Sequence, residues 1–122
     1  MRKVKVKICG LKRAQDIECV NRLLPDYIGF VFAKTKREVT EQQAAQLKAM
    51  LNPQIKAVGV FVNAEIDKII LLAKSRTIDI IQLHGDEDAA YCERLRLQTE
   101  LPIIKAVRVK DAGSFENLQA YP

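Results

Sequence analysis

Short runs of hydrophobic residues alternate with longer amphipathic stretches along the whole chain. The runs are rich in Val, Ile and Phe, and successive runs start 23, 30, 22 and 24 residues apart. The middle three show little polar alternation, which is typical of strands covered on both faces. The sequence therefore predicts five β-strands, at residues 4–8, 27–32, 57–62, 79–83 and 103–109.

The stretches between these runs carry hydrophobic residues at three- and four-residue steps, which predict helices. Thr40 with Gln43 forms a capping box, Asn63 is the predicted N-cap of the third helix, and Asp86 suits the first turn of the fourth. A fifth helix is predicted to start at Asp111 or Ser114. The inward-facing residues of the first four are expected to be Leu11, Ala14, Ile17, Val20, Leu24, Ala44, Leu47, Leu51, Ile66, Ile69, Ile70, Ala73, Ala89, Cys92 and Leu95.

A strand followed by a helix, repeated at this spacing, predicts an α/β fold with a parallel sheet. Two architectures satisfy the repeat. A (β/α)8 barrel needs at least ~200 residues, so the length of 122 residues favours a doubly wound open sheet. The chain has no GxGxxG or GxxxxGK[ST] motif, however, so a nucleotide-binding open sheet would lack its phosphate loop.

The amino-acid composition limits the kinds of binding partner that we expect. The net charge is +5, but Lys and Arg are scattered and Trp is absent, which disfavours nucleic acid and favours an anionic small substrate. The longest apolar stretch, residues 57–62, is far shorter than the ~20 residues of a membrane helix.

The cysteines indicate a reducing compartment. The chain has three cysteines without a CxxC pair and a single histidine, His84, which favours reduced thiols over a zinc site or disulfides. No targeting segment is recognisable at the start, so we expect a cytoplasmic protein.

Functional groups are expected at the carboxyl ends of the strands, because the loops there converge on one face. Those positions hold Cys9, residues 34–37, Asn63, residues 82–84 and Arg108. Cys9 is a candidate nucleophile or base if nearby cations favour its thiolate, and Lys5 and Lys7 share its side of the first strand. The alternative for Cys9 is a small buried hydrophobic residue, which is also the stronger interpretation of Cys19 and Cys92.

Two further side chains are candidates for substrate contacts. Arg37 could hold a carboxylate or phosphate in two parallel hydrogen bonds, or it could be a solvated loop charge. His84 could bind substrate or transfer a proton, or it could cap the next helix. The acidic run at 86–88 is interpreted only as a favourable helix N-terminus and is assigned no chemistry.

Five segments together resemble one enzyme family. They are KICG at 7–10, GFVF at 29–32, KR at 36–37, GVFVN at 59–63 and QLHGDE at 82–87. In this order and spacing they resemble the phosphoribosylanthranilate isomerases of tryptophan biosynthesis. The resemblance covers the whole chain and favours the (β/α)8 barrel over the open sheet, with residues 1–122 forming a single domain that comprises the first five βα units.

The resemblance also implies a reaction. The family converts N-(5-phosphoribosyl)anthranilate to 1-(2-carboxyphenylamino)-1-deoxyribulose 5-phosphate by an Amadori rearrangement, without metal or organic cofactor. Cys9 matches the general base and Arg37 the group that holds the anthranilate carboxylate. Gln82 and His84 match positions that line the substrate pocket.

The main departure from the family is length. The family's general acid follows strand six and its phosphate site follows strands seven and eight, positions beyond these 122 residues. We therefore expect a truncated form with little or no activity alone. The alternative is a non-catalytic half-barrel that assembles with a partner or with itself, and the oligomeric state is left open.

Overall fold

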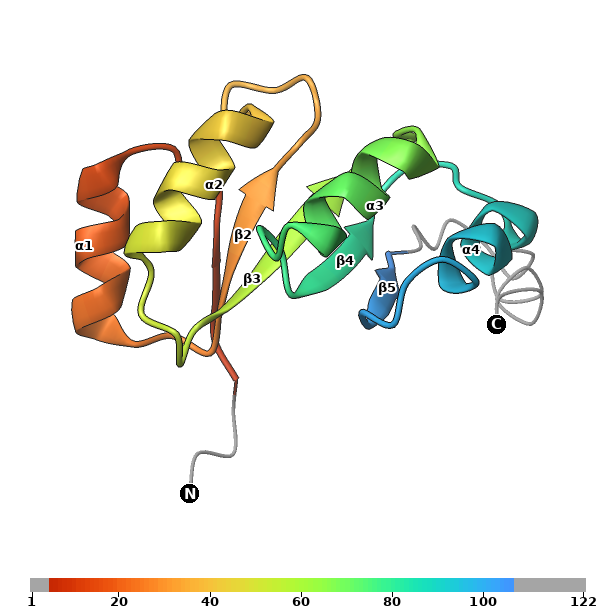
Figure 1. Cartoon of the computed structure of the whole chain (residues 1–122). Coiled ribbons are helices and arrows are strands. Elements are labelled where there is room, and N and C mark those ends of the chain that lie inside the picture. The colour runs from red at the N-terminus through yellow and green to blue at the C-terminus, as the bar shows by residue number, and fades with distance from the viewer. Residues whose placement is uncertain (1–4, 107–122) are drawn as a thin grey trace.

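The computed structural model describes residues 5–106, in which five strands alternate with four helices. Predictions for Val4 and for residues 107–122, including Arg108 and the fifth helix, lie outside the described residues. Figure 1 shows the strands side by side and the helices that connect them. The elements are β1 (Lys7–Cys9), α1 (Ala14–Leu23), β2 (Tyr27–Val31), α2 (Glu41–Met50), β3 (Lys56–Phe61), α3 (Ile66–Lys74), β4 (Ile80–Leu83), α4 (Ala89–Arg96) and β5 (Ile103–Lys105).

The strands form one parallel sheet in chain order, β1-β2-β3-β4-β5. Crossover connections between parallel strands are almost always right-handed. Because every crossover here moves one strand in the same direction, the helices lie on one face of the sheet, as α2 and α3 do in Figure 1. The predicted parallel βα repeat is confirmed.

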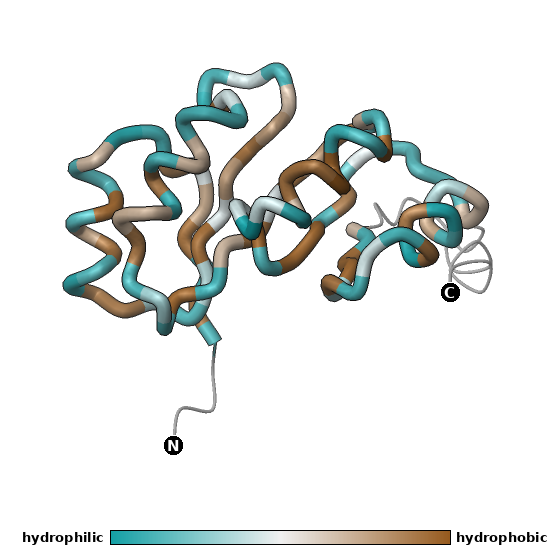
Figure 2. The backbone as a smooth tube through the Cα atoms, in the orientation of Figure 1, coloured by the Kyte–Doolittle hydropathy of each residue, from teal (hydrophilic) through white to brown (hydrophobic). Residues whose placement is uncertain are grey.

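The hydrophobic core lies between the sheet and its helices. Alternate strand residues pack there against residues of all four helices, and the rings of Phe32 and Phe61 stack at 5.2 Å. Such a ring pair adds about 0.5–1.5 kcal/mol to the effect of burial. Figure 2 shows the hydrophobic segments on the strands and on α3, whereas the loop between β2 and α2 is mostly hydrophilic. The strand residues of this core are Ile28, Phe30, Ala57, Phe61, Ile81 and Leu83.

The other face of the sheet carries no helix in the described part of the chain. We call it the open face; strand alternation and register assign to it Lys7, Cys9, Tyr27, Gly29, Val31, Val58, Val60, Ile80, Gln82 and Ile104. Val58 and Val60 are buried, but Ile80 and Gln82 are only half-buried. Tyr27 and Val31 of β2 are half-buried as well, so the prediction that all three middle strands are covered on both faces is wrong for β2 and β4.

Helix starts confirm one prediction and correct two. In the capping box of α2, Thr40 Oγ1 accepts from the Gln43 amide at 3.1 Å and Gln43 Oε1 accepts from the Thr40 amide at 2.9 Å. Asn63 does not cap α3: its backbone is left-handed at φ +50°, and the actual N-cap is Glu65, two residues later. The fourth helix also starts later than predicted, with the Asp88 side chain as its cap.

The first helix departs from its predicted inner face. Ile17 and Val20 are buried as expected, whereas Ala14, Cys19 and Leu24 are exposed. Ala14 is the first residue of the ten-residue helix, of which only Ile17 and Val20 are buried. Leu24 is the C-cap at φ +50°, which moves its side chain off the helical face. Cys19 lies two positions from Ile17 and hence on the outer side, so a buried Cys19 is wrong.

Candidate active site

The four predicted site residues lie at the same end of the sheet. Cys9 ends β1, Gln82 lies near the end of β4, and His84 follows that strand directly. Arg37 comes from the loop between β2 and α2. These are all carboxyl ends of parallel strands, so the topology brings the four residues to one edge.

Two glycines make room for the side chains of Arg37 and Cys9. Gly10 has φ +88°, and a Cβ there would lie 2.5 Å from Arg37 Cδ and 3.2 Å from Arg37 Nε. A Cβ on Gly29 would lie 2.6 Å from Cys9 Sγ. The arginine side chain therefore packs on the residue next to the thiol, and the sulfur lies over β2 on the open face.

Lysine ammonium groups share this face with the thiol. Lys7 Nζ donates to Gln82 Oε1 at 2.6 Å, a bond that joins β1 to β4 across the two strands between them. Lys5 Nζ lies 3.3 Å from the Tyr27 hydroxyl and 5.8 Å from the centre of that ring. The expected clustering of these cations on the side of Cys9 is confirmed.

His84 is exposed, and its backbone amide donates to the Phe61 carbonyl at 2.8 Å, which extends the β3–β4 ladder. Among the described residues its ring has no hydrogen-bond partner. The alternative in which His84 caps the next helix is wrong, because Asp88 does so. The imidazole is therefore open to a ligand.

The three cysteines differ in accessibility. All are free thiols; Cys9 and Cys19 are exposed and Cys92 is buried. Burial raises the pKa of the Cys92 thiol, which keeps it protonated and unreactive. The buried alternative for Cys9 is excluded by its exposure. Residues 5–106 contain no group of three or more His, Cys, Asp or Glu placed to hold a metal ion.

The sequence interpretation missed a buried carboxylate behind this site. Glu87, in the acidic run assigned no chemistry, has a fully buried side chain whose Oε1 lies 2.8 Å from Lys105 Nζ. Burial alone would raise the pKa of Glu87, but hydrogen bonds from Lys105 and the Asn63 amide outweigh burial and lower the pKa. The sequence signal is faint, because the partners lie 24 and 18 residues away.

Acid should therefore destabilise the protein partly through Glu87. Its folded-state pKa lies below the usual 4.5, so the carboxylate stabilises the fold above about pH 4.5 and this stabilisation is lost as pH falls through the folded-state pKa. We expect the free energy of unfolding to fall less steeply toward low pH in Glu87→Gln than in wild type. Urea titrations between roughly pH 3 and pH 7, which span that window, measure this free energy. Glu93→Gln, an exposed acid on α4, is the control; parallel curves for Glu87→Gln and wild type would contradict the assignment.

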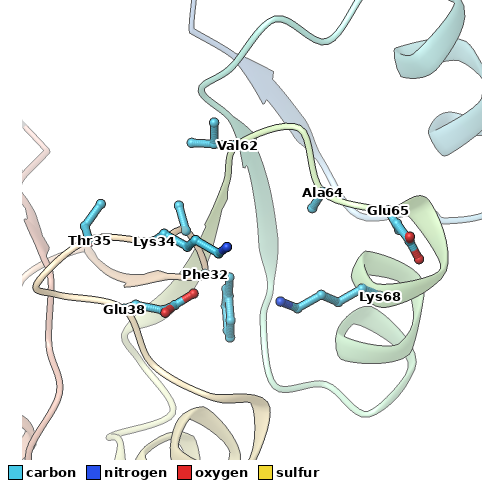
Figure 3. Close-up of a pocket in the computed structure, with 9 residues that line it drawn as sticks. Phe32, Lys34, Thr35, Glu38, Val62, Ala64, Glu65 and Lys68 are labelled. Carbon is cyan, nitrogen blue, oxygen red and sulfur yellow. The ribbon is translucent and has the colours of Figure 1, made fainter.

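A separate cavity of about 640 Å³ lies between the loop after β2 and the start of α3. In Figure 3 the ammonium groups of Lys34 and Lys68 point toward each other near the Phe32 ring. Glu38 and Glu65 also line the cavity and balance the two lysine charges. None of the four predicted site residues lines it, so this cavity is distinct from the candidate site.

Comparison with solved structures defines the class of fold. The chain is similar to the mutually generated monomers of dimeric phosphoribosylanthranilate isomerase from Thermotoga maritima, with a TM-score of 0.83 and 34% identity, covering 98% of this chain and 62% of that one. A phosphoribosyl anthranilate isomerase in complex with reduced 1-(o-carboxyphenylamino)-1-deoxyribulose 5-phosphate is similar at a TM-score of 0.82 and 34% identity, over 98% and 62% of the two chains. The fold is an incomplete (β/α)8 barrel.

Sequence comparison then specifies the family. The model of N-(5'-phosphoribosyl)anthranilate (PRA) isomerase matches residues 6–121. The isomerase of that name from Endomicrobium trichonymphae is 50% identical over 107 residues, which cover 88% of this chain and 54% of the relative. The chain belongs to the PRA isomerase family. It spans about half the length of the curated relatives it matches.

None of the helices within residues 5–106 has the length and apolar character needed to cross a membrane.

Proposed function

We propose that this chain supplies the base and the carboxylate-binding group of an isomerase that converts N-(5-phosphoribosyl)anthranilate to 1-(2-carboxyphenylamino)-1-deoxyribulose 5-phosphate in tryptophan biosynthesis. Membership of the family supports the reaction. The observation that carries the site is the packing of Arg37 on Gly10, directly beside the exposed Cys9. Two groups with different tasks thereby lie within reach of one small substrate.

Cys9 acts as the general base in this proposal. Once the ribose ring has opened to a protonated Schiff base, the thiolate removes the proton from C2, and the electron pair moves toward the nitrogen. Proton transfer of this kind needs a group that is accessible and titrates near neutral pH. An exposed thiol on the face that also carries Lys5 and Lys7 meets the requirement of accessibility.

Arg37 holds the anthranilate carboxylate. The planar guanidinium offers two parallel N–H donors, which match the two oxygens of a carboxylate. Gln82 and His84 complete the substrate pocket in this proposal, because the Gln82 side chain lies on the open face and the exposed His84 follows β4 directly. The substrate is thus bound as an anion at its aromatic end, and no metal or organic cofactor takes part.

Arg37→Ala tests the carboxylate assignment. Hydrogen bonds to charged groups contribute about 1.5–3 kcal/mol, so we expect KM to rise about 10- to 150-fold with little change in kcat. The assay uses a chimera in which residues 1–106 of this chain replace the corresponding part of the Endomicrobium trichonymphae relative. Arg22→Ala, an exposed arginine in the last turn of α1, is the control; an unchanged KM in Arg37→Ala would exclude Arg37 as the binding group.

Residues 1–122 are proposed as a single domain that contributes the first five βα units of the barrel. The general acid and phosphate site implied by the family resemblance belong to further units, so a polypeptide of these 122 residues alone should show little or no turnover. The cytoplasmic localisation and the exclusion of nucleic-acid partners stay predictions from the sequence.

A second candidate function is assembly of this half-barrel with another polypeptide or a second copy. Within residues 5–106, β1 and β5 are edge strands, and Val62 and Ile104 are 44% and 48% exposed. Unpaired parallel edges and exposed apolar side chains favour association. Sedimentation of the 122-residue chain, alone and mixed with the C-terminal part of the Endomicrobium relative, tests this. A stable complex supports assembly, whereas sedimentation as a monomer in both samples contradicts it.

A further inference from the structure

A buried ion pair lies on the helix side of the sheet, behind the edge that carries the candidate site. The Glu87 side chain has no exposed surface, and the Lys105 side chain is 12% exposed. Lys105 belongs to β5, two residues after Ile103, which packs into the core, so its ammonium lies on the face opposite Gln82. Neither residue can contact a ligand bound on the open face.

The ion pair is hydrogen-bonded to the backbone of the turn that follows β4. Glu87 Oε1 accepts from the Gly85 amide at 3.0 Å, and Lys105 Nζ donates to the Gly85 carbonyl at 2.5 Å. Glu87 Oε2 accepts from the Asn63 amide at 2.8 Å, and Asn63 Oδ1 accepts from the Asp86 amide at 2.9 Å. Both polar groups of Gly85 are thus held, and the turn after β4 is joined to the ends of β3 and β5.

This turn follows His84 directly. The ladder bond from the His84 amide to Phe61 fixes the backbone before the turn, and the ion pair fixes it afterwards. Gly85 also has no room for a side chain, since a Cβ would lie 2.9 Å from Asn63 Oδ1. The direction in which the imidazole projects is therefore determined by groups on the far side of the sheet.

Stability alone does not account for a charged pair here. Replacing a buried ion pair by apolar residues of similar volume is often neutral or stabilising. The turn, however, needs two acceptors for the amides of Gly85 and Asn63 and a donor for the Gly85 carbonyl, which a carboxylate and an ammonium supply together. Apolar replacements would leave all three backbone groups without these partners.

We infer that Glu87 and Lys105 are positioning residues that hold the His84 ring at the mouth of the site. That His84 then binds substrate rests on the proposed function; its placement by the ion pair does not. Removing either member should release the Gly85 turn and let the imidazole sample more than one position.

The chain contains a single histidine, so NMR signals of the imidazole can be assigned without ambiguity. In the full 122-residue chain, we expect one sharp set of His84 ring signals for wild type and a displaced or doubled set for both Glu87→Gln and Lys105→Met. The two variants change charge in opposite directions, so a purely electrostatic effect would shift the signals in opposite directions. Displacement in the same direction, or doubling in both, supports positioning.

Asp86→Asn is the matched control, because it removes an exposed charge from the same turn and leaves the pair intact. If either variant fails to fold, Asn63→Gly replaces it: glycine tolerates φ +50° and loses only the bond to the Asp86 amide, so a smaller displacement is expected. His84 signals that match wild type in the folded variants would overturn the inference.

Adding reduced 1-(o-carboxyphenylamino)-1-deoxyribulose 5-phosphate to the same samples separates positioning from function. We expect the compound to shift the His84 signals of wild type and Asp86→Asn, and to shift those of Glu87→Gln and Lys105→Met at least several-fold less at equal concentration. If the compound shifts none of them while the ligand-free variants differ as expected, the assignment of His84 as a substrate contact of these five βα units fails and the positioning role stands.

Discussion

Replacing Cys9 by serine should lower kcat of the chimeric isomerase by about 10²- to 10⁴-fold, the range that a positioned general base contributes. A serine hydroxyl fits over Gly29 as the sulfur does, so the fold and KM should change little. The hydroxyl, however, does not ionise near neutral pH and cannot accept the C2 proton. Steady-state kinetics with N-(5-phosphoribosyl)anthranilate measure both constants.

Cys19→Ser is the matched control for this experiment. Cys19 is also an exposed free thiol, but it lies on the outer side of α1, away from the open face. Its replacement should leave kcat within about two-fold of wild type, as is usual for surface substitutions away from structural features. A Cys9→Ser enzyme that retains more than a tenth of the wild-type kcat would exclude Cys9 as the base.

Of the substitutions proposed for this protein, Lys105→Met should lower the free energy of unfolding the most. The change removes the ammonium from beside the buried Glu87 carboxylate, and breaking one side of a buried pair costs about 3–5 kcal/mol. Total stability is only about 5–15 kcal/mol for a domain, so the urea midpoint should fall markedly. Trp is absent from the chain, so far-UV circular dichroism is the suitable measure of unfolding.

An exposed ion pair provides the comparison. Arg13 and Asp16 lie 3.3 Å apart with side chains 72% and 26% exposed, and such pairs contribute about 0–1 kcal/mol. Arg13→Met should therefore change the free energy of unfolding by less than about 1 kcal/mol. If Lys105→Met lowered the free energy of unfolding no more than Arg13→Met does, the buried Glu87 carboxylate would have found another partner or reached water.

Local sequence signals predicted the parts of the fold that depend on neighbours in sequence. The capping box at Thr40 is such a case, because both of its hydrogen bonds join residues three positions apart. Asn63 shows the limit of this approach. The residue type suits an N-cap, but its side chain accepts from Asp86, which comes from the next βα loop and is visible only in three dimensions.

The candidate site was predictable to the extent that topology alone determines it. Parallel strands place their carboxyl ends at one edge, so the βα repeat by itself is enough to group Cys9, Gln82 and His84. The supporting Glu87 could not be found in this way, because its partners follow β3 and lie within β5. An acidic run before a helix has an ordinary local explanation, and nothing in the run distinguishes the one buried member from the two exposed ones.

The hydrogen bond from Lys7 to Gln82 fixes the orientation of the Gln82 side-chain amide. An ammonium can only donate, so the Gln82 carbonyl oxygen is the atom it occupies, and the amide presents its NH2 group to whatever else enters. The Arg37 guanidinium comes from a loop at the same end of the sheet, so both groups offer N–H donors there. A molecule rich in oxygen acceptors is complementary to such a surface, whereas one that brings mainly its own N–H groups finds little to bind.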